Sequence, residues 1–144
     1  MKKTWEHPAI MVQQFEANEY VAACWGVGCS VNDANSIEQS MGNYNSNSLY
    51  HDADHCGLSG NQVIYDDNND GVADRMVEVG TDGLGTLSCT IYTDAYYTTQ
   101  KSIGSVKAGD TIYWTTSAGN GWNKKTWHHV GTVFDTVPGH PNRS

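Results

Sequence analysis

The chain has 144 residues, close to the usual size of one domain, with 38% hydrophobic residues, 17% charged residues and a net charge of −8. The small share of charged residues is made up by Gly, Asn, Ser, Thr and Tyr. This composition excludes a coiled coil or a bundle of long helices. The longest apolar run, Tyr20 to Trp25, is too short for a membrane helix, and the acidic balance argues against nucleic-acid binding.

The first sixty residues contain few regular elements. Ala9 to Phe15 predicts a short strand, and Glu16 to Cys24 predicts one or two helical turns that end at Gly26. Residues 30–62 are rich in Asn, Ser, Asp and Gly and predict mostly loop. Within them, a capping-box pattern over Ser36 to Gln39 predicts a very short helix.

The pattern typical of strands is stronger in the second half of the chain. Short runs of alternating β-branched, aromatic and aliphatic residues lie at Gln62 to Tyr65, Arg75 to Val79, Thr86 to Thr93, Thr111 to Thr116 and Thr126 to Phe134. Turn signals about every 8–12 residues, with no long amphipathic helix, predict an all-β fold. We expect an antiparallel β-sandwich, jelly-roll or immunoglobulin-like, as a single domain over residues 30–144, preceded by an extended N-terminal arm over residues 1–29.

An acidic loop gives the clearest candidate site. The pattern Asp-x-Asn-x-Asp-Gly-x-x-Asp begins at Asp66, in a stretch with eight acidic residues and one basic residue. Oxygens at the first, third and fifth positions of such a loop converge on one ion, and the glycine allows the sharp turn. The run resembles the calcium loops of strand-flanked extracellular repeats, and the alternative is an ion-free Asn/Asp-rich turn. The predicted calcium ligands are Asp66, Asn68, Asp70, the carbonyl group of Val72, and Asp74.

A second candidate site consists of histidines. His51 and His55, next to Cys56, form one pair, and His128 and His129 form another. Two such pairs could give a zinc ion its four ligands. Adjacent residues on a strand point to opposite faces, however, so the alternative places one of His128 and His129 in the core and the other in solvent.

Four cysteines, Cys24, Cys29, Cys56 and Cys89, bear on both stability and compartment. An even count in a small, Asn- and Gly-rich β-type chain predicts one or two disulfides, with free thiols as the alternative. The first residues do not form a standard secretory signal. We therefore expect an extracellular or cell-surface location reached without such a signal, with the cytoplasm as the alternative.

The N-terminal segment W-x-x-P-x-I-x-V-Q-x-F-x-A-N-E-Y-V-A-A-C runs from Trp5 to Cys24. It resembles the opening of small, uncharacterised proteins of anaerobic Gram-positive bacteria, a resemblance that implies no activity. An extended strand of this kind could add to the open sheet edge of a neighbouring copy, which predicts a homo-oligomer or larger assembly. The alternative is that the strand pairs within its own sheet.

These patterns favour a non-catalytic structural or surface-assembly subunit, in the extreme case a filament-forming one, with a calcium loop and disulfide cross-links. The sequence has no nucleophile elbow, HExxH, Walker or dinucleotide-binding motif, so no catalytic or cofactor-binding residue is predicted. One alternative is a zinc-binding module or metal-dependent enzyme built on the histidines. Another is a carbohydrate- or protein-binding module that uses Trp114, Trp122 and Trp127.

Overall fold

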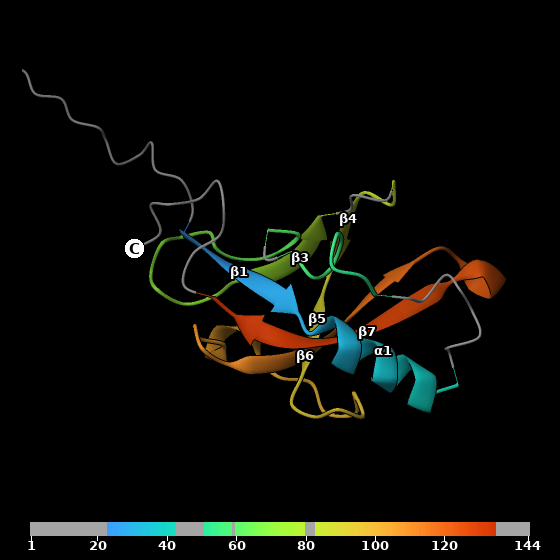
Figure 1. The fold of residues 1–144 in the computed structure, drawn as a ribbon. Helices are drawn as coiled ribbons and strands as arrows, with labels where there is room; N and C mark the ends of the chain where they lie inside the picture. The colour runs from blue at the N-terminus through green and yellow to red at the C-terminus, as the bar shows by residue number, and fades with distance from the viewer. Residues whose placement is uncertain (1–22, 43–50, 59, 80–82, 135–144) are drawn as a thin grey trace, which may run out of the picture.

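A computed structural model describes residues 23–42, 51–58, 60–79 and 83–134 (Figure 1). The strands are β1 (Ala23–Cys29), β2 (Gln62–Asp66), β3 (Arg75–Val79), β4 (Thr86–Ser88), β5 (Thr90–Tyr92), β6 (Thr111–Ala118) and β7 (Lys125–Val133). Within these ranges the helical elements are α1 (Val31–Ser40) and the short 3-10 helices η3 (Ile103–Ser105) and η4 (Gly121–Asn123). Among the described residues, no helix is long and apolar enough to cross a membrane.

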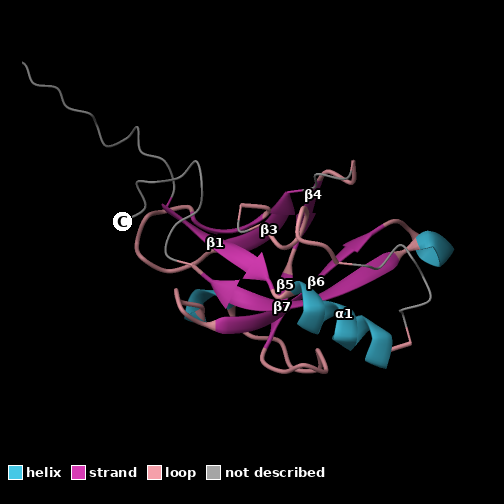
Figure 2. Ribbon diagram, viewed as in Figure 1, coloured by secondary structure: helices cyan, strands magenta, loops and turns pink. Residues whose placement is uncertain are grey.

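All neighbouring strands are antiparallel and belong to one sheet in the order β4-β3-β2-β1-β7-β6-β5 (Figure 2). The predicted all-β antiparallel class is therefore confirmed. The two end strands of this order, β4 and β5, follow each other directly in the chain. Cys89 alone separates them, and its N–H donates to the carbonyl of Met76 at 3.0 Å. The sheet must therefore curl until its two edges meet at Cys89.

The core lies on the inner face of this curled sheet. Cross-strand partners such as Trp25 and Ile64, or Ile91 and Trp114, point to the same side, and all four are buried. The β-branched and aromatic residues that predicted the strands are therefore the ones that fill the interior.

The helix α1 is longer than the pattern at Ser36 to Gln39 predicts. It starts after Ser30, which has extended backbone angles, and carries Asp33 in its first turn, where a negative charge favours a helix start. Ala34 and Glu38 are buried, so one narrow stripe of the helix faces the protein. The structure therefore has ten helical residues where mostly loop was predicted.

The predicted N-terminal elements are described only in part. The helical prediction was wrong at residues 23 and 24, which belong to β1, and β1 lies in the middle of the sheet between β2 and β7. Residues 1–22, including the strand predicted over Ala9 to Phe15, lie outside the described residues.

Candidate metal centre

Four buried side chains converge where β1 and β7 meet the loop that follows α1. They are Cys29, His51, Cys56 and His129, and their ligand atoms all lie within 4.8 Å of one another. In the part of the chain that the structure describes, no other group of three or more His, Cys, Asp or Glu residues has this compactness. Two sulfur and two imidazole ligands around one point have the composition of a metal site.

Strand pairing brings Cys29 and His129 together. Cys29 ends β1 and lies opposite Gly131 on β7, so its side chain is on the same face as that of His129, two residues earlier. Gly131 has no side chain there, and a Cβ atom would lie 2.0 Å from the carbonyl oxygen of Gly28. The close backbone approach leaves the Cys29 sulfur 3.8 Å from His129 Nδ1.

A tightly turned loop places His51 and Cys56. The side-chain amide of Asn35 on α1 holds the backbone of His51 through two hydrogen bonds, of 2.8 and 2.9 Å. Asp52 Oδ1 accepts from the backbone N–H groups of Asp54 and His55, both at 2.9 Å, and so fixes the turn that follows. The N–H of Cys29 donates to the carbonyl of Cys56 at 3.1 Å, which joins the loop to β1.

The loop directs its two ligands inward. The Cys56 sulfur lies 3.4 Å from His51 Nδ1, and Cys29 and Cys56 are 3.3 Å apart. The rings of His51 and His129 meet edge to face, with centroids 4.6 Å apart. Both histidines therefore turn Nδ1 towards the sulfurs, which leaves Nε2 free to face outward.

Each outward Nε2 atom has an oxygen partner. His51 Nε2 lies 3.4 Å from Glu38 Oε1, and Glu38 is only 2% exposed. His129 Nε2 lies 3.2 Å from the hydroxyl of Thr116 and 3.5 Å from Glu78 Oε2. Metal-bound histidines commonly donate their second N–H to such a carboxylate or hydroxyl, which fixes the ring and its tautomer.

The indole of Trp114 completes the support of His129. The two rings are stacked, with centroids 4.9 Å apart and an angle of 4° between their planes. Trp114 is opposite His129 in the β6–β7 register and is fully buried. The His129 ring is therefore held by strand pairing, stacking and a hydrogen bond at once.

The electrostatics of the group favour a thiolate at Cys56 and a thiol at Cys29. The hydrogen bond with Cys56, together with burial, raises the pKa of Cys29, and the same hydrogen bond lowers the pKa of Cys56, assisted by His129 and His51. Burial opposes the charged form of His51, but hydrogen bonds with Cys56 and Glu38 raise its pKa to about 9. A thiolate is the form of cysteine that binds metals, so the site stabilises a metal-binding state of Cys56.

The distances are close to those around a tetrahedral metal ion. Zinc–sulfur bonds of about 2.3 Å and zinc–nitrogen bonds of about 2.0–2.1 Å place neighbouring ligand atoms roughly 3.3–3.8 Å apart. The two sulfurs are 3.3 Å apart and the two sulfur–nitrogen distances are 3.4 and 3.8 Å, so each differs from its tetrahedral value (about 3.8 Å for S–S and about 3.6 Å for S–N) by about 0.5 Å or less. The Cys2His2 group can therefore bind a metal ion with small side-chain adjustments.

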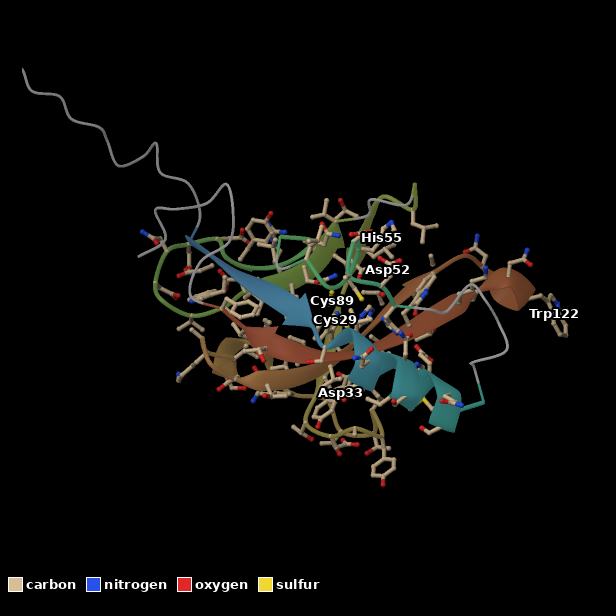
Figure 3. The ribbon with its side chains drawn as sticks, in the orientation of Figure 1. Cys29, Asp33, Asp52, His55, Cys89 and Trp122 are labelled. Carbon is tan, nitrogen blue, oxygen red and sulfur yellow. The ribbon has the colours of Figure 1, made fainter. Side chains whose placement is uncertain are left out.

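The structure separates the four histidines that the sequence suggests as zinc ligands. His51 and His129 belong to the Cys2His2 group. His55 is exposed and pairs with Asp52 at 2.7 Å, and the two lie together in Figure 3. His128 points away from His129, as expected for neighbours on a strand, and its Nδ1 lies 3.3 Å from both oxygens of Glu38.

The structure corrects the prediction of disulfides as permanent cross-links. Cys29, Cys56 and Cys89 are free thiols, and the side chain of Cys24 lies outside the described residues. Cys29 and Cys56 are neighbours in space without a bond between them. Cys89 lies at the junction of β4 and β5, outside the Cys2His2 group, where burial raises its pKa well above the usual value. Two of the described cysteines, Cys29 and Cys56, are therefore potential metal ligands rather than halves of a disulfide.

The acidic loop between β2 and β3 is held by its own backbone. The buried carboxylate of Asp66 accepts from the N–H groups of Asp70, at 3.1 Å, and Gly71, at 2.7 Å. Asp70 in turn accepts from the N–H of Val72 at 2.9 Å, and Asp74 accepts from that of Asp67 at 2.8 Å. These oxygens therefore cap the turn, as in an ion-free Asx-rich loop. Calcium binding by Asp66, Asn68, Asp70, Val72 and Asp74 stays a prediction.

The three tryptophans of the binding-module alternative lie in different environments. Trp114 is in the core, and Trp127 is half-buried. Only Trp122 is fully exposed, at the far tip of the β6–β7 hairpin (Figure 3). The three do not form one aromatic surface.

No known protein family matches this chain, and neither a curated protein nor a solved structure is detectably similar to it.

Proposed function

We propose that the protein is a non-catalytic β-domain whose fold is stabilised by one zinc ion held by Cys29, His51, Cys56 and His129. The observation that carries this proposal is the convergence of two sulfurs and two imidazoles, all buried, within 4.8 Å. Mixed thiolate and imidazole ligands favour zinc over calcium or magnesium, which prefer oxygen.

A structural role is favoured over a catalytic one because the ligand set is complete. Catalytic zinc sites usually have three protein ligands and leave the fourth position to water or substrate. Here four side chains surround the centre, and each ligand residue is at most 8% exposed. Such a closed site stabilises the segments that supply its ligands, since the ion binds the folded state only.

The place of the site in the sheet supports the same role. β1 pairs with β7 over three residue pairs only, whereas β6 pairs with β7 over eight and β1 with β2 over five. The ligands Cys29 and His129 lie on the two sides of this short pairing. A zinc ion would therefore strengthen the connection between the β1–β3 and β5–β7 parts of the sheet.

Metal analysis of the purified protein tests the proposal. We expect inductively coupled plasma mass spectrometry to find one zinc ion per chain. We also expect the cobalt-substituted protein to show the visible absorption of tetrahedral thiolate-bound cobalt. Cys56→Ser and His129→Ala should lose the ion. The matched variants Cys89→Ala and His55→Ala should retain it, because neither residue belongs to the group.

Two results would overturn the zinc proposal. One is a folded wild-type protein that neither contains zinc nor takes up zinc or cobalt. The other is retention of the ion by a folded His129→Ala variant. The cobalt spectrum of the wild-type protein decides the question even if a variant fails to fold.

A further inference from the structure

The distance between the two sulfurs of the Cys2His2 group lies between that of a disulfide and that of two thiolates on one zinc ion. Cys29 and Cys56 are 3.3 Å apart. A disulfide requires about 2.05 Å, and two thiolates on one tetrahedral zinc ion stand roughly 3.8 Å apart. The sulfurs would approach by about 1.25 Å to form the disulfide or separate by about 0.5 Å to bind zinc, and side-chain rotation can supply either change.

We propose that a peroxide converts Cys29 and Cys56 into a disulfide and thereby releases the structural zinc ion, so that the site is a redox-controlled switch. This inference rests on the proposed zinc site. One zinc-bound thiolate attacks the peroxide, which gives a sulfenic acid and hydroxide as the O–O bond breaks. The second thiolate then attacks the sulfenic sulfur, forms the S–S bond and expels a second hydroxide. Two electrons pass from the sulfurs to the peroxide, and the zinc ion leaves because both sulfur ligands are consumed.

The backbone around the two cysteines favours this reaction. The Cys29 N–H donates to the Cys56 carbonyl at 3.1 Å, so the two residues are joined at the backbone before any S–S bond forms. The buried side chain of Gln62, with its amide nitrogen facing β1, donates to the carbonyls of Cys56 and Val27 at 2.8 and 2.9 Å. Only the cysteine side chains need to move, since the Cys29 N–H and the Cys56 carbonyl are already held by hydrogen bonds.

The two sulfur ligands are also the more accessible half of the group. Cys29 and Cys56 are 8% and 6% exposed, compared with 4% for His51 and 2% for His129. A peroxide is little larger than water and can reach such residues through small openings of the loop. Cys89 lies outside the group, so it is not positioned to compete for the Cys29–Cys56 bond.

Release of the ion need not unfold the domain. The disulfide would join the end of β1 to the loop after α1, the same two segments that the sulfurs of the zinc site connect. Only His51 and His129 would lose their partner. We therefore expect the oxidised protein to keep its strands while it gives up zinc, which distinguishes a switch from oxidative damage.

The test treats the zinc-loaded, full-length protein with graded hydrogen peroxide. A colorimetric chelator follows zinc release, and peptide mapping identifies the cysteines that are linked. We expect zinc release to match formation of a Cys29–Cys56 disulfide, with strand content unchanged by circular dichroism. A thiol reductant plus zinc should restore the loaded state. The Cys89→Ala variant should behave as the wild type does.

The outcomes separate this inference from the zinc proposal. If zinc is bound but stays bound while peroxide oxidises Cys89, the redox inference is wrong and the zinc site stands. If zinc leaves only with unfolding, or with sulfinic acid in place of the disulfide, the inference is also wrong. A protein that binds no zinc at all refutes the zinc proposal itself, which the metal analysis establishes before any peroxide is added.

Discussion

Glu38 offers the sharpest single-residue test of the metal centre. Its carboxylate accepts a 2.6 Å hydrogen bond from the backbone N–H of His128 and lies 3.4 Å from His51 Nε2. Glu38→Gln preserves the size of the side chain but removes the charge that orients the His51 ring. Loss of such an outer partner weakens metal affinity by about 10–100-fold, which corresponds to roughly 1.4–2.8 kcal/mol.

Competition with a chelator of known affinity measures this effect. The matched control is Asp33→Asn, the same chemical change on the exposed side of α1, for which we expect unchanged zinc affinity. The unfolding free energy of both metal-free variants separates a loss of zinc affinity from a general loss of helix packing. Wild-type zinc affinity in a folded Glu38→Gln variant would refute the idea that this carboxylate supports the centre.

Three further predictions concern stability. Gly131→Ala should destabilise the protein by about 3 kcal/mol and abolish zinc binding, because its Cβ would lie 2.0 Å from a carbonyl oxygen. Gly104→Ala is the control in the same denaturation assay, since the nearest atom to its Cβ would be a side-chain methyl group at 3.2 Å. Asp66→Ala should lower the free energy of unfolding by about 2–3 kcal/mol even with a chelator present, since the Asp66 carboxylate accepts hydrogen bonds from two backbone N–H groups. A melting temperature that calcium raises only in the wild type would instead establish the predicted calcium site. In the metal-free protein the pKa of His51 is raised from 6.5 to about 9. The protonated His51 ring therefore stabilises the fold fully below pH 6.5, and this contribution is lost as the pH rises through 9. Denaturant midpoints across this range should fall for the wild type and stay flatter for His51→Gln.

Most strands could be predicted from local alternation. The runs beginning at Gln62, Arg75, Thr111 and Thr126 fall on β2, β3, β6 and β7, with boundaries within one or two residues. The run at Thr86 to Thr93 was predicted as one strand, but its two halves pair with different partners, β3 and β6. Local sequence gives no indication of that change of partner, because it follows from the curling of the whole sheet.

β1 was missed for a specific physical reason. Gly26 and Gly28 predict a break in regular structure, since glycine is unfavourable in a strand interior. In the fold, glycine on both sides of the β1–β7 pairing permits an unusually close approach, and a Cβ at Gly131 would collide with the Gly28 carbonyl. The same residues that weaken the local strand pattern are thus required by the tertiary contact.

The metal centre could be predicted only in fragments. His51 and Cys56 are close in sequence, but Cys29 and His129 are 100 residues apart and meet only through strand register. The supporting residues Glu38, Glu78 and Thr116 carry no motif at all. A spacing rule finds ligands on one turn or one hairpin, and it cannot find ligands that a sheet brings together.

The position of the centre explains why a chain of this composition would use a metal. Only 38% of its residues are hydrophobic, and two large buried positions, Gln62 and Glu38, are polar. Joining β1 to β7 closes a very long segment of chain, which costs conformational entropy. The three residue pairs between these strands offset only a small part of that cost. An ion held by Cys29 and His129 would add two strong bonds at that closure without additional apolar side chains. The Cys2His2 group therefore lies where the sheet has its shortest central pairing, and a bound ion there would compensate for the few β1–β7 contacts.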